Sequence, residues 1–324
     1  MNNMNMKTFS KDLANPQANS NPWSSELREL RELRLGDWRV LALPTGIFGL
    51  DGGAMFGTVP KVLWQKTNPP DAENRIAMEA RALLLLNETL GHRVLVDCGV
   101  GGDFVEKYGP KLGPKFAEMY AIEAGQSGLE RALQRVGVEP ERITDVVLTH
   151  LHFDHAGGAT KWDGQRLVPT LPRATYHVQK RNLETATSPN VRERASYFAA
   201  NFEPLRQAGV LNLLDGEVKD LLPGLSLWVS DGHTSGQQVV RIEGGGEVLY
   251  YCGDVIPTST HVRLAWVMGY DLRPLDLIEE KRRLLAQAST ESALLYFEHD
   301  PYMDCARVAA DRDDFKVSER FRLS

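Results

Sequence analysis

The chain contains little cysteine, and this limits the kinds of site it can build. Its 324 residues include three cysteines and no C-x-x-C pair. A disulfide framework or a thiolate zinc knuckle requires more cysteines at closer spacing, so the sequence excludes both. We expect Cys98, Cys252 and Cys305 to be small, buried, apolar side chains.

A secretory signal and a membrane-spanning run are also missing. Residues 1–21 are rich in asparagine and other polar side chains, without the apolar stretch that a secretory signal needs. The longest aliphatic run, the leucines at 83–86, is far too short to cross a bilayer. We therefore predict a cytoplasmic, soluble protein with a flexible tail over residues 1–22 and no membrane partner.

Basic residues are outnumbered by acidic ones. The chain has 37 Lys and Arg against 43 Asp and Glu, a formal net charge of −6. Binding to a phosphate backbone needs clustered basic residues, so we expect no nucleic-acid partner. With 42% hydrophobic and 25% charged residues, the composition is that of a globular protein. No repeat or low-complexity linker marks a boundary, so residues 23–324 are predicted to form one domain.

Apolar periodicity and turn residues predict a mixture of strands and helices. Strands are predicted over Trp38–Leu43, Met78–Leu86, His92–Asp97, Thr144–Thr149, Ala174–Val178, Ser226–Ser230, Val239–Ile242, Val248–Tyr251 and Ala293–Phe297. Helices are predicted over Ser25–Arg34, from a capping box at Ser127 to about Gly137, over Val191–Gly209 and over Pro274–Ala288.

Four possible metal ligands lie within six residues directly after a predicted strand. They are His150, His152, Asp154 and His155. An extended backbone sends the first two to the same side, and a turn can wrap the next two around a neighbouring point, which predicts two adjacent metal sites. Imidazole with carboxylate suits zinc, and also iron, cobalt or manganese. A lone histidine is more often a satisfied core residue, but this density favours metal binding.

This H-x-H-x-D-H segment resembles that of the metallo-β-lactamase superfamily. The resemblance implies three later ligands: His233 in a G-H-T motif, Asp254 as a bridge, and His299 after a strand. One ion would be held by His150, His152 and His233, and the other by Asp154, His155 and His299, with Asp254 shared. Asp154 and Asp254 would also be the catalytic carboxylates.

The resemblance implies an αββα sandwich, an α/β (α+β) fold with two mixed β-sheets, helices outside and the metals at one edge. Residues 52–60 and 253–270 are similar to the branch of quorum-quenching N-acyl-homoserine lactonases and methyl-parathion-hydrolase-like enzymes. This similarity implies hydrolysis of lactones, esters or organophosphate triesters by a hydroxide shared between two divalent ions. The alternatives are another ester or thioester hydrolase of this fold, glyoxalase II-like, and a non-catalytic metal-binding protein.

Further roles follow from the same resemblance. Asp97 would accept a hydrogen bond from a ligand histidine and orient it. Lactonases of this group often have a tyrosine shortly after the bridging aspartate, whereas this chain has Val255–Thr258 there, which favours the methyl-parathion-hydrolase-like members. Residues that would cover or line a pocket for a small-molecule substrate are Met55, Phe56, Trp64, His261, Trp266 and Met268. A homodimer is also expected to be possible.

Overall fold

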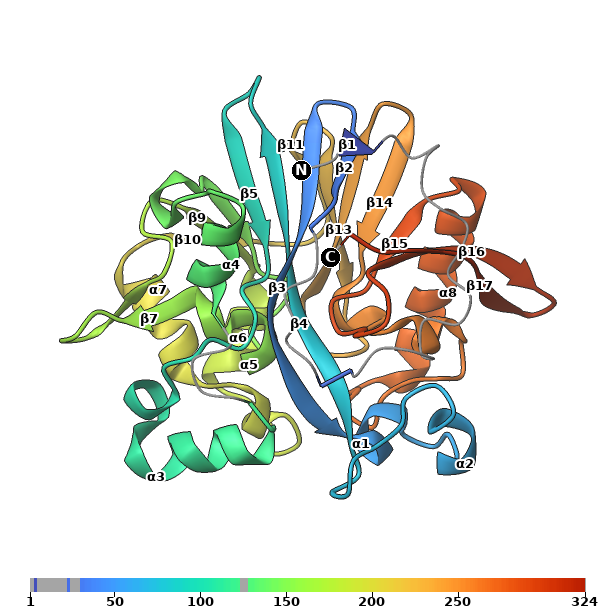
Figure 1. Ribbon diagram of the computed structural model, residues 1–324, viewed down its shortest axis with the longest axis horizontal. Coiled ribbons are helices and arrows are strands. Elements are labelled where there is room, and N and C mark those ends of the chain that lie inside the picture. The colour runs from blue at the N-terminus through green and yellow to red at the C-terminus, as the bar shows by residue number, and fades with distance from the viewer. Residues whose placement is uncertain (1–2, 5–21, 24–29, 123–127, 324) are drawn as a thin grey trace.

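Two mixed β-sheets pack face to face in the computed structural model, which describes residues 3–4, 22–23, 30–122 and 128–323 (Figure 1). In spatial order, the eight-stranded sheet contains β1 (Asn3–Met4), β2 (Glu32–Leu35), β3 (Trp38–Asp51), β4 (Arg75–Asn87), β5 (His92–Val96), β6 (Asp145–Val147), β9 (Thr175–Gln179) and β10 (Leu211–Leu214). The seven-stranded sheet contains β11 (Val218–Leu222), β12 (Leu225–Ser230), β13 (Gln237–Gly244), β14 (Glu247–Tyr251), β15 (Leu294–Tyr296), β16 (Cys305–Asp311) and β17 (Asp314–Phe321). Strands β7 (Thr160–Trp162) and β8 (Leu167–Pro169) form a separate pair.

Helices cover the outer faces of the two sheets (Figure 1). The first sheet is covered by α4 (Leu129–Arg135), α6 (Lys180–Thr187) and α7 (Glu203–Gln207), and the second by α8 (Pro274–Thr290). The remaining α-helices are α1 (Gly52–Phe56), α2 (Lys61–Trp64), α3 (Phe104–Met119) and α5 (Phe153–Ala156). Short 3-10 turns are η3 (Pro140–Arg142), η4 (Gly157–Ala159), η5 (Arg194–Ser196), η6 (Ala199–Asn201), η7 (Gly253–Val255) and η8 (Ser259–Val262). The predicted αββα sandwich is confirmed.

The run of four leucines lies in β4, whose two faces are both buried. Leu83 and Leu85 pack into the core between the sheets, while Leu84 and Leu86 pack beneath the helices of the first sheet. Successive side chains of a strand point to opposite faces, so a strand covered on both sides needs an unbroken apolar sequence. This explains why the segment shows no alternation of polar and apolar residues.

The predicted helix at Ser25–Arg34 is wrong in its described part. Residues 24–29 lie outside the described residues, and Glu32–Leu35 forms β2, antiparallel to β3. Leu33 and Leu35 are buried between the sheets, so tertiary burial outweighs the helical spacing of the leucines. The capping-box residue Ser127 also lies outside the described residues, and the helix that follows, α4, ends at Arg135.

The predicted helix over Val191–Gly209 is instead three short turns, η5, η6 and α7. Pro204 occupies the first turn of α7. Proline has no N–H to donate and clashes with the preceding turn, so it can begin this helix but not lie in the middle of a longer one. The predicted helix over Pro274–Ala288 matches α8.

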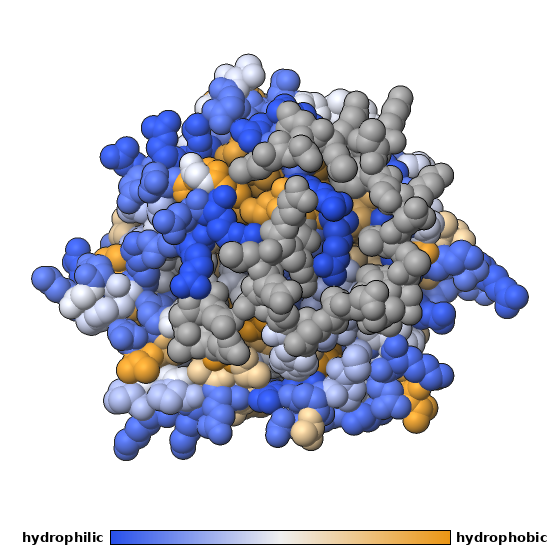
Figure 2. Space-filling model, viewed as in Figure 1, coloured by the Kyte–Doolittle hydropathy of each residue, from blue (hydrophilic) through white to orange (hydrophobic). Residues whose placement is uncertain are grey.

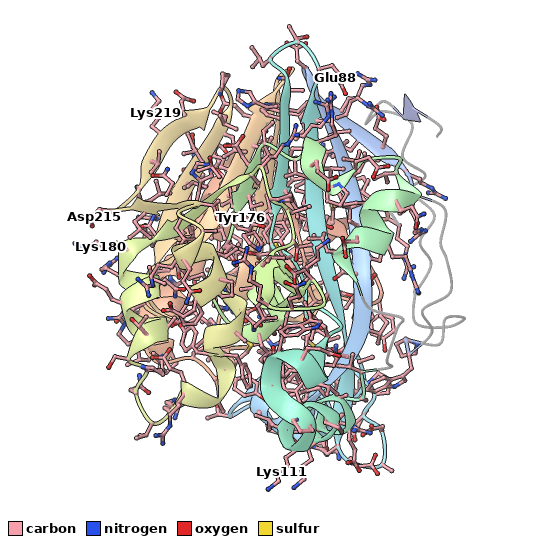
Figure 3. All side chains as sticks on the ribbon, turned by 90° about the vertical axis from the view of Figure 1, so that its left-hand side faces the viewer. Glu88, Lys111, Tyr176, Lys180, Asp215 and Lys219 are labelled. Atoms are coloured by element: carbon pink, nitrogen blue, oxygen red, sulfur yellow. The ribbon has the colours of Figure 1, made fainter. Side chains whose placement is uncertain are left out.

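Many charged side chains lie at the periphery of the molecule. Figure 3 shows Glu88, Lys111 and Lys219 at the outline, whereas Tyr176 lies inside. Hydrophilic residues also form most of the coloured surface in Figure 2. None of the helices in the described ranges has the length and apolarity to cross a membrane.

Candidate metal centre

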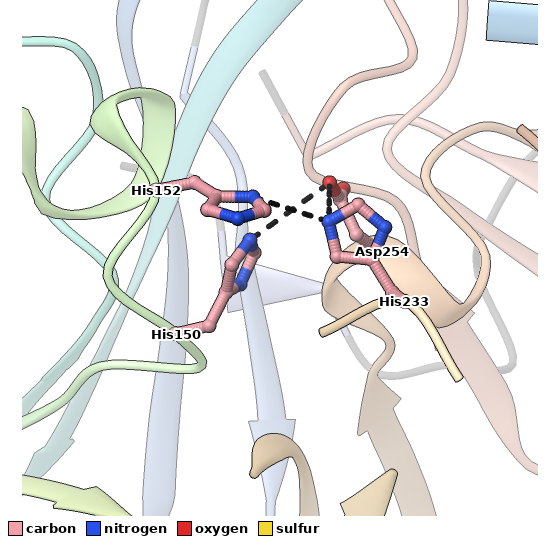
Figure 4. Close-up of side chains that lie close together, drawn as sticks. All are labelled: His150, His152, His233 and Asp254. Carbon is pink, nitrogen blue, oxygen red and sulfur yellow. Dashed lines mark hydrogen bonds and ion pairs between the residues drawn. The ribbon is translucent and has the colours of Figure 1, made fainter. Parts of the chain in front are cut away.

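All seven expected ligands follow strands of the two sheets and meet at one edge of the sandwich. His150 and His152 follow β6, and Asp154 and His155 lie in α5 just beyond them. The second sheet supplies His233 after β12, Asp254 after β14 and His299 after β15. The site therefore joins the two halves of the molecule, as Figure 4 shows for four of these side chains.

The first cluster contains His150, His152, His233 and Asp254, whose ligand atoms all lie within 4.8 Å of one another (Figure 4). His233 Nε2 is 3.2 Å from His152 Nδ1 and 3.2 Å from Asp254 Oδ2. His150 Nε2 is 4.0 Å from the same oxygen. These four donors surround a single point, as the ligands of one metal ion do.

The second cluster contains Asp154, His155, His299 and again Asp254. His299 Nε2 lies 3.2 Å from His155 Nε2, 3.3 Å from Asp254 Oδ1 and 3.6 Å from Asp154 Oδ2. Asp254 thus presents Oδ2 to the first cluster and Oδ1 to the second. One carboxylate placed in this way can bridge two ions.

Three of the ligand histidines have an acceptor for the ring nitrogen that faces away from the clusters, and this fixes their tautomers. His233 Nδ1 donates to Asp271 Oδ1 at 2.9 Å, and His299 Nδ1 donates to the Glu79 carbonyl at 2.8 Å. His155 Nδ1 lies 3.0 Å from Asp97 Oδ2. Each ring therefore carries its lone pair on Nε2, inside the site.

Lone pairs that face one another at 3.2 Å repel unless a positive charge lies between them. In addition, His150 Nε2 and Asp254 Oδ1 are buried and have no hydrogen-bond partner among the described residues. Buried polar atoms without a partner are costly. The clusters therefore suit metal ions, and their imidazole and carboxylate donors fit a divalent transition metal.

Asp97 directly follows β5 and is held in place by Thr149. Its Oδ1 accepts the Thr149 N–H at 2.7 Å, and its Oδ2 accepts the Thr149 hydroxyl at 2.7 Å. The backbone of Asp97 has φ +56°, a left-handed conformation that is unfavourable for a residue other than glycine. These bonds hold the carboxylate against His155, where the sequence analysis expected it.

Two acidic residues of the site were not anticipated from the sequence. Glu298 Oε2 lies 2.8 Å from His155 Nδ1, so this nitrogen faces two carboxylates. Burial raises the pKa of Glu298 to about 8, His155 opposes the rise and Asp97 adds to it. Asp271 orients His233 from a long loop that carries no motif. For Glu298, its position beside His299 at the end of a strand was the only sequence signal for a role in the site.

The ligand histidines differ in their affinity for protons. Burial, followed by neighbouring histidines, lowers the pKa of His150 and of His152 well below the usual value. Burial also lowers the pKa of His299, but Glu298 and Asp254 outweigh it and raise the value to about 9. The second cluster therefore attracts positive charge, whether a proton or a metal ion.

Two glycines allow the ligand loop to pack closely against the end of β5. A Cβ atom on Gly157 would lie 2.0 Å from the Val100 carbonyl oxygen, and one on Gly158 would lie 2.2 Å from that of Cys98. Neither distance is sterically possible. Close approach of the two backbones thus requires glycine after His155.

The expected pocket residues lie in and around one aromatic cluster beside the ligands. Met55, Phe56, Trp64 and Met268 are each at most 4% exposed and belong to the same hydrophobic cluster as Phe153. This cluster also contains Phe48, whose ring centroid is 5.5 Å from that of His299. These four side chains are therefore packed behind the site rather than open to solvent.

Trp266 and His261 take different positions. Trp266 is partly buried and contacts Phe56 edge-on, with 5.8 Å between ring centroids. His261 is buried, and both of its ring nitrogens have protein partners: Nδ1 lies 2.7 Å from Thr258 Oγ1 and Nε2 lies 2.9 Å from the Met55 carbonyl.

The segment after the bridging aspartate carries no phenol, and Ile256 there is fully buried. Tyr197 approaches from another element, with its ring centroid 4.6 Å from that of His152. Its hydroxyl is 2.7 Å from Thr234 Oγ1 and accepts from Asn182 at 3.4 Å. These hydrogen bonds direct the Tyr197 hydroxyl to the G-H-T segment.

The chain is similar in sequence to known N-acyl homoserine lactonases. The N-acyl homoserine lactonase of a Bacillus species is 27% identical over 234 residues, which are 66% of this chain and 79% of that protein. The N-acyl homoserine lactonase of Bacillus cereus is 31% identical over 176 residues, which are 52% of this chain and 60% of that protein.

Solved structures share the fold. A probable metal-dependent hydrolase from Staphylococcus aureus is 26% identical with a TM-score of 0.79, covering 89% of this chain and 98% of its own. AidC, a dizinc quorum-quenching lactonase, is 19% identical with a TM-score of 0.71, covering 90% of this chain and 97% of its own. Residues 83–299 match the metallo-beta-lactamase superfamily, a segment that contains all seven clustered ligands. The chain therefore belongs to the metallo-beta-lactamase superfamily.

Proposed function

We propose that the chain is a hydrolase that binds two divalent ions, zinc foremost, and cleaves ester-type bonds in lactones, esters or organophosphate triesters. The observation that carries this proposal is the position of Asp254, whose two oxygens face two separate histidine clusters at 3.2 and 3.3 Å. Relatives named N-acyl homoserine lactonase support the lactone as the first substrate class.

Each ligand has a proposed place in the centre. His150, His152 and His233 would hold one ion, Asp154, His155 and His299 the other, and Asp254 both. When bound, two such ions supply a nucleophile at neutral pH by lowering the pKa of water to about 7, and they polarise the oxygen of the scissile group.

The chain's remaining task is to hold these donors in place before substrate arrives. Asp97, Asp271 and the Glu79 carbonyl each bind the outer nitrogen of one histidine, so the rings cannot rotate away. Phe48 packs against the His299 ring and, with Phe153, belongs to the aromatic cluster that shields this side of the donors from water. Preorganised donors of this kind need no rearrangement during the reaction.

The test is a substrate panel at equal metal loading. The zinc-loaded protein is assayed for kcat/KM on an N-acyl homoserine lactone, an aryl ester and a paraoxon-like triester, beside Asp254→Asn. We expect the highest value on the lactone and loss of all three activities in the variant. Asp215→Asn is the matched control because this carboxylate is exposed at the outline of the molecule (Figure 3) and belongs to neither ligand cluster. Two bound ions without hydrolysis of any substrate would leave a metal-binding protein and overturn the proposal.

A further inference from the structure

A cavity of about 720 Å³ lies outside the metal centre. Its walls come from the loop around Ser259–Trp266, from β17, from α2, and from residues 302–303. None of the seven clustered ligands lines it. Figure 1 shows β17 and α2 on the same side of the molecule as α8, away from the helices of the first sheet. Cavities of this size commonly hold small molecules.

The charge of this cavity opposes that of the whole chain. Although the formal net charge is −6, the described residues lining the cavity include Arg263, Lys316 and Arg320 and no carboxylate. Lys316 forms an exposed ion pair with Asp311 at 3.4 Å. Arg263 and Arg320 have no ion-pair partner in the described parts of the chain. Two guanidinium groups are thus available to an outside anion.

Carboxylates close to the cavity wall are already engaged by the protein. Asp300 is buried and accepts the N–H and the hydroxyl of Ser259 through one oxygen, and the N–H of Tyr302 through the other. Asp314 accepts the N–H of Leu264 at 2.9 Å. These acids hold the wall in shape, and none of the described residues forms an ion pair with either arginine.

The rest of the wall is largely apolar and aromatic. Trp266 and Phe315 line the cavity together with Leu63 and Met303. The Arg263 guanidinium lies 5.9 Å from the centre of the Trp266 ring, so this arginine already rests on an aromatic face. A ligand that satisfies both kinds of surface has an anionic group and an apolar body.

We propose that this cavity is a binding site for an organic anion: a carboxylate, sulfonate or phosphate ester that carries an alkyl or aryl chain. Arg263 and Arg320 bind the anionic group, and Trp266 and Phe315 contact the apolar part. The site is separate from the metal centre and does not depend on the reaction proposed above.

The experiment is calorimetric titration of the metal-loaded protein with octane-1-sulfonate, whose sulfonate is a weak metal ligand, and with octan-1-ol as its neutral counterpart. We expect one sulfonate per chain, bound at least about tenfold more tightly than the alcohol, which is the weight of one charge-assisted hydrogen bond. The variant Arg263→Gln/Arg320→Gln should lose that preference. The matched control, Arg131→Gln/Arg173→Gln, removes two exposed arginines elsewhere and should keep it.

Three outcomes would overturn the proposal. Equal binding of sulfonate and alcohol would show an apolar cavity without anion recognition. Unchanged sulfonate affinity in Arg263→Gln/Arg320→Gln would place the ligand elsewhere, and loss of binding in Asp254→Asn would place it at the metal centre. As a check that needs no variant, added salt should weaken sulfonate binding and leave alcohol binding unchanged.

Discussion

The two clusters of the metal centre differ in the charge that surrounds them. The first combines three histidines with the shared Asp254, and the pKa values of His150 and His152 lie well below the usual value because of burial and histidine neighbours. The second has Asp154 besides Asp254, with Asp97 and Glu298 behind His155. Thus both clusters share the charge of Asp254, and the second has one more carboxylate among its ligands and two further carboxylates behind His155.

The largest expected effect is that of the residue common to both clusters. Asp254→Asn removes a charge that faces both sets of histidines, so we expect kcat/KM to fall by about a thousandfold, equal to about 4 kcal/mol of transition-state stabilisation. Steady-state kinetics on the best substrate of the panel measures it. Activity within threefold of the Asp215→Asn control would show that no carboxylate bridge is needed.

Variants confined to one cluster come next and test the difference between the two. His152→Ala and Asp154→Ala should each retain one ion per chain and lose about a hundredfold in kcat/KM. Because the second cluster carries more negative charge, its ion should leave last when the wild-type protein is titrated with a chelator. Simultaneous release of both ions would contradict the difference described above.

The orienting carboxylates should have smaller effects. Asp271→Asn and Asp97→Asn keep the size of the side chain but weaken the hold on His233 and on His155, so each should lower zinc affinity by about 10- to 100-fold. Competition with a chromophoric chelator measures this loss. If either variant bound zinc as tightly as the wild type, that carboxylate would be a structural residue with no role in orienting its ligand.

The smallest effect concerns a buried lysine behind the loop that carries Asp271. Lys281 Nζ donates to the carbonyls of His261 at 2.9 Å and Trp266 at 2.8 Å. Burial lowers its pKa from 10.5 to about 7, partly offset by Asp271 and Asp314. Between these two pH values the unfolded chain binds a proton that the folded chain does not, so the free energy of unfolding should rise with pH.

Lys281→Met should lack this rise. Denaturant unfolding at the two ends of the window, for the wild type and the variant, measures the slope. Lys180→Met is the matched control because Lys180 is exposed and its substitution leaves the buried amine in place (Figure 3). Equal slopes in the wild type and Lys281→Met would show that the lysine stays charged in the folded protein.

The sequence predicted the ligands that lie within one local motif and those that the family resemblance implies. It missed the residues whose roles depend on tertiary contacts. The ligands from His150 to His155 lie within one loop, so their spacing alone indicated a metal site. His233, Asp254 and His299 follow strands far apart in the chain, and only the family resemblance joined them. Asp271 belongs to a loop without a motif, and its role depends on where that loop packs, which no local pattern encodes.

The same distinction holds for the fold. Residues 83–86 were correctly placed in a strand because apolar β-sequence and burial agree there. Helical spacing was misleading at Glu32–Leu35, where pairing with β3 buries the leucines. It was also misleading across residues 191–209, where Pro204 begins a new short helix, α7.

The measurement that tests the central claim most directly is the metal content of the purified protein after zinc loading and exhaustive dialysis, taken by mass spectrometry per mole of chain. The account predicts two zinc ions in the wild type and fewer in Asp254→Asn. A wild-type chain that retains one ion or none would contradict it.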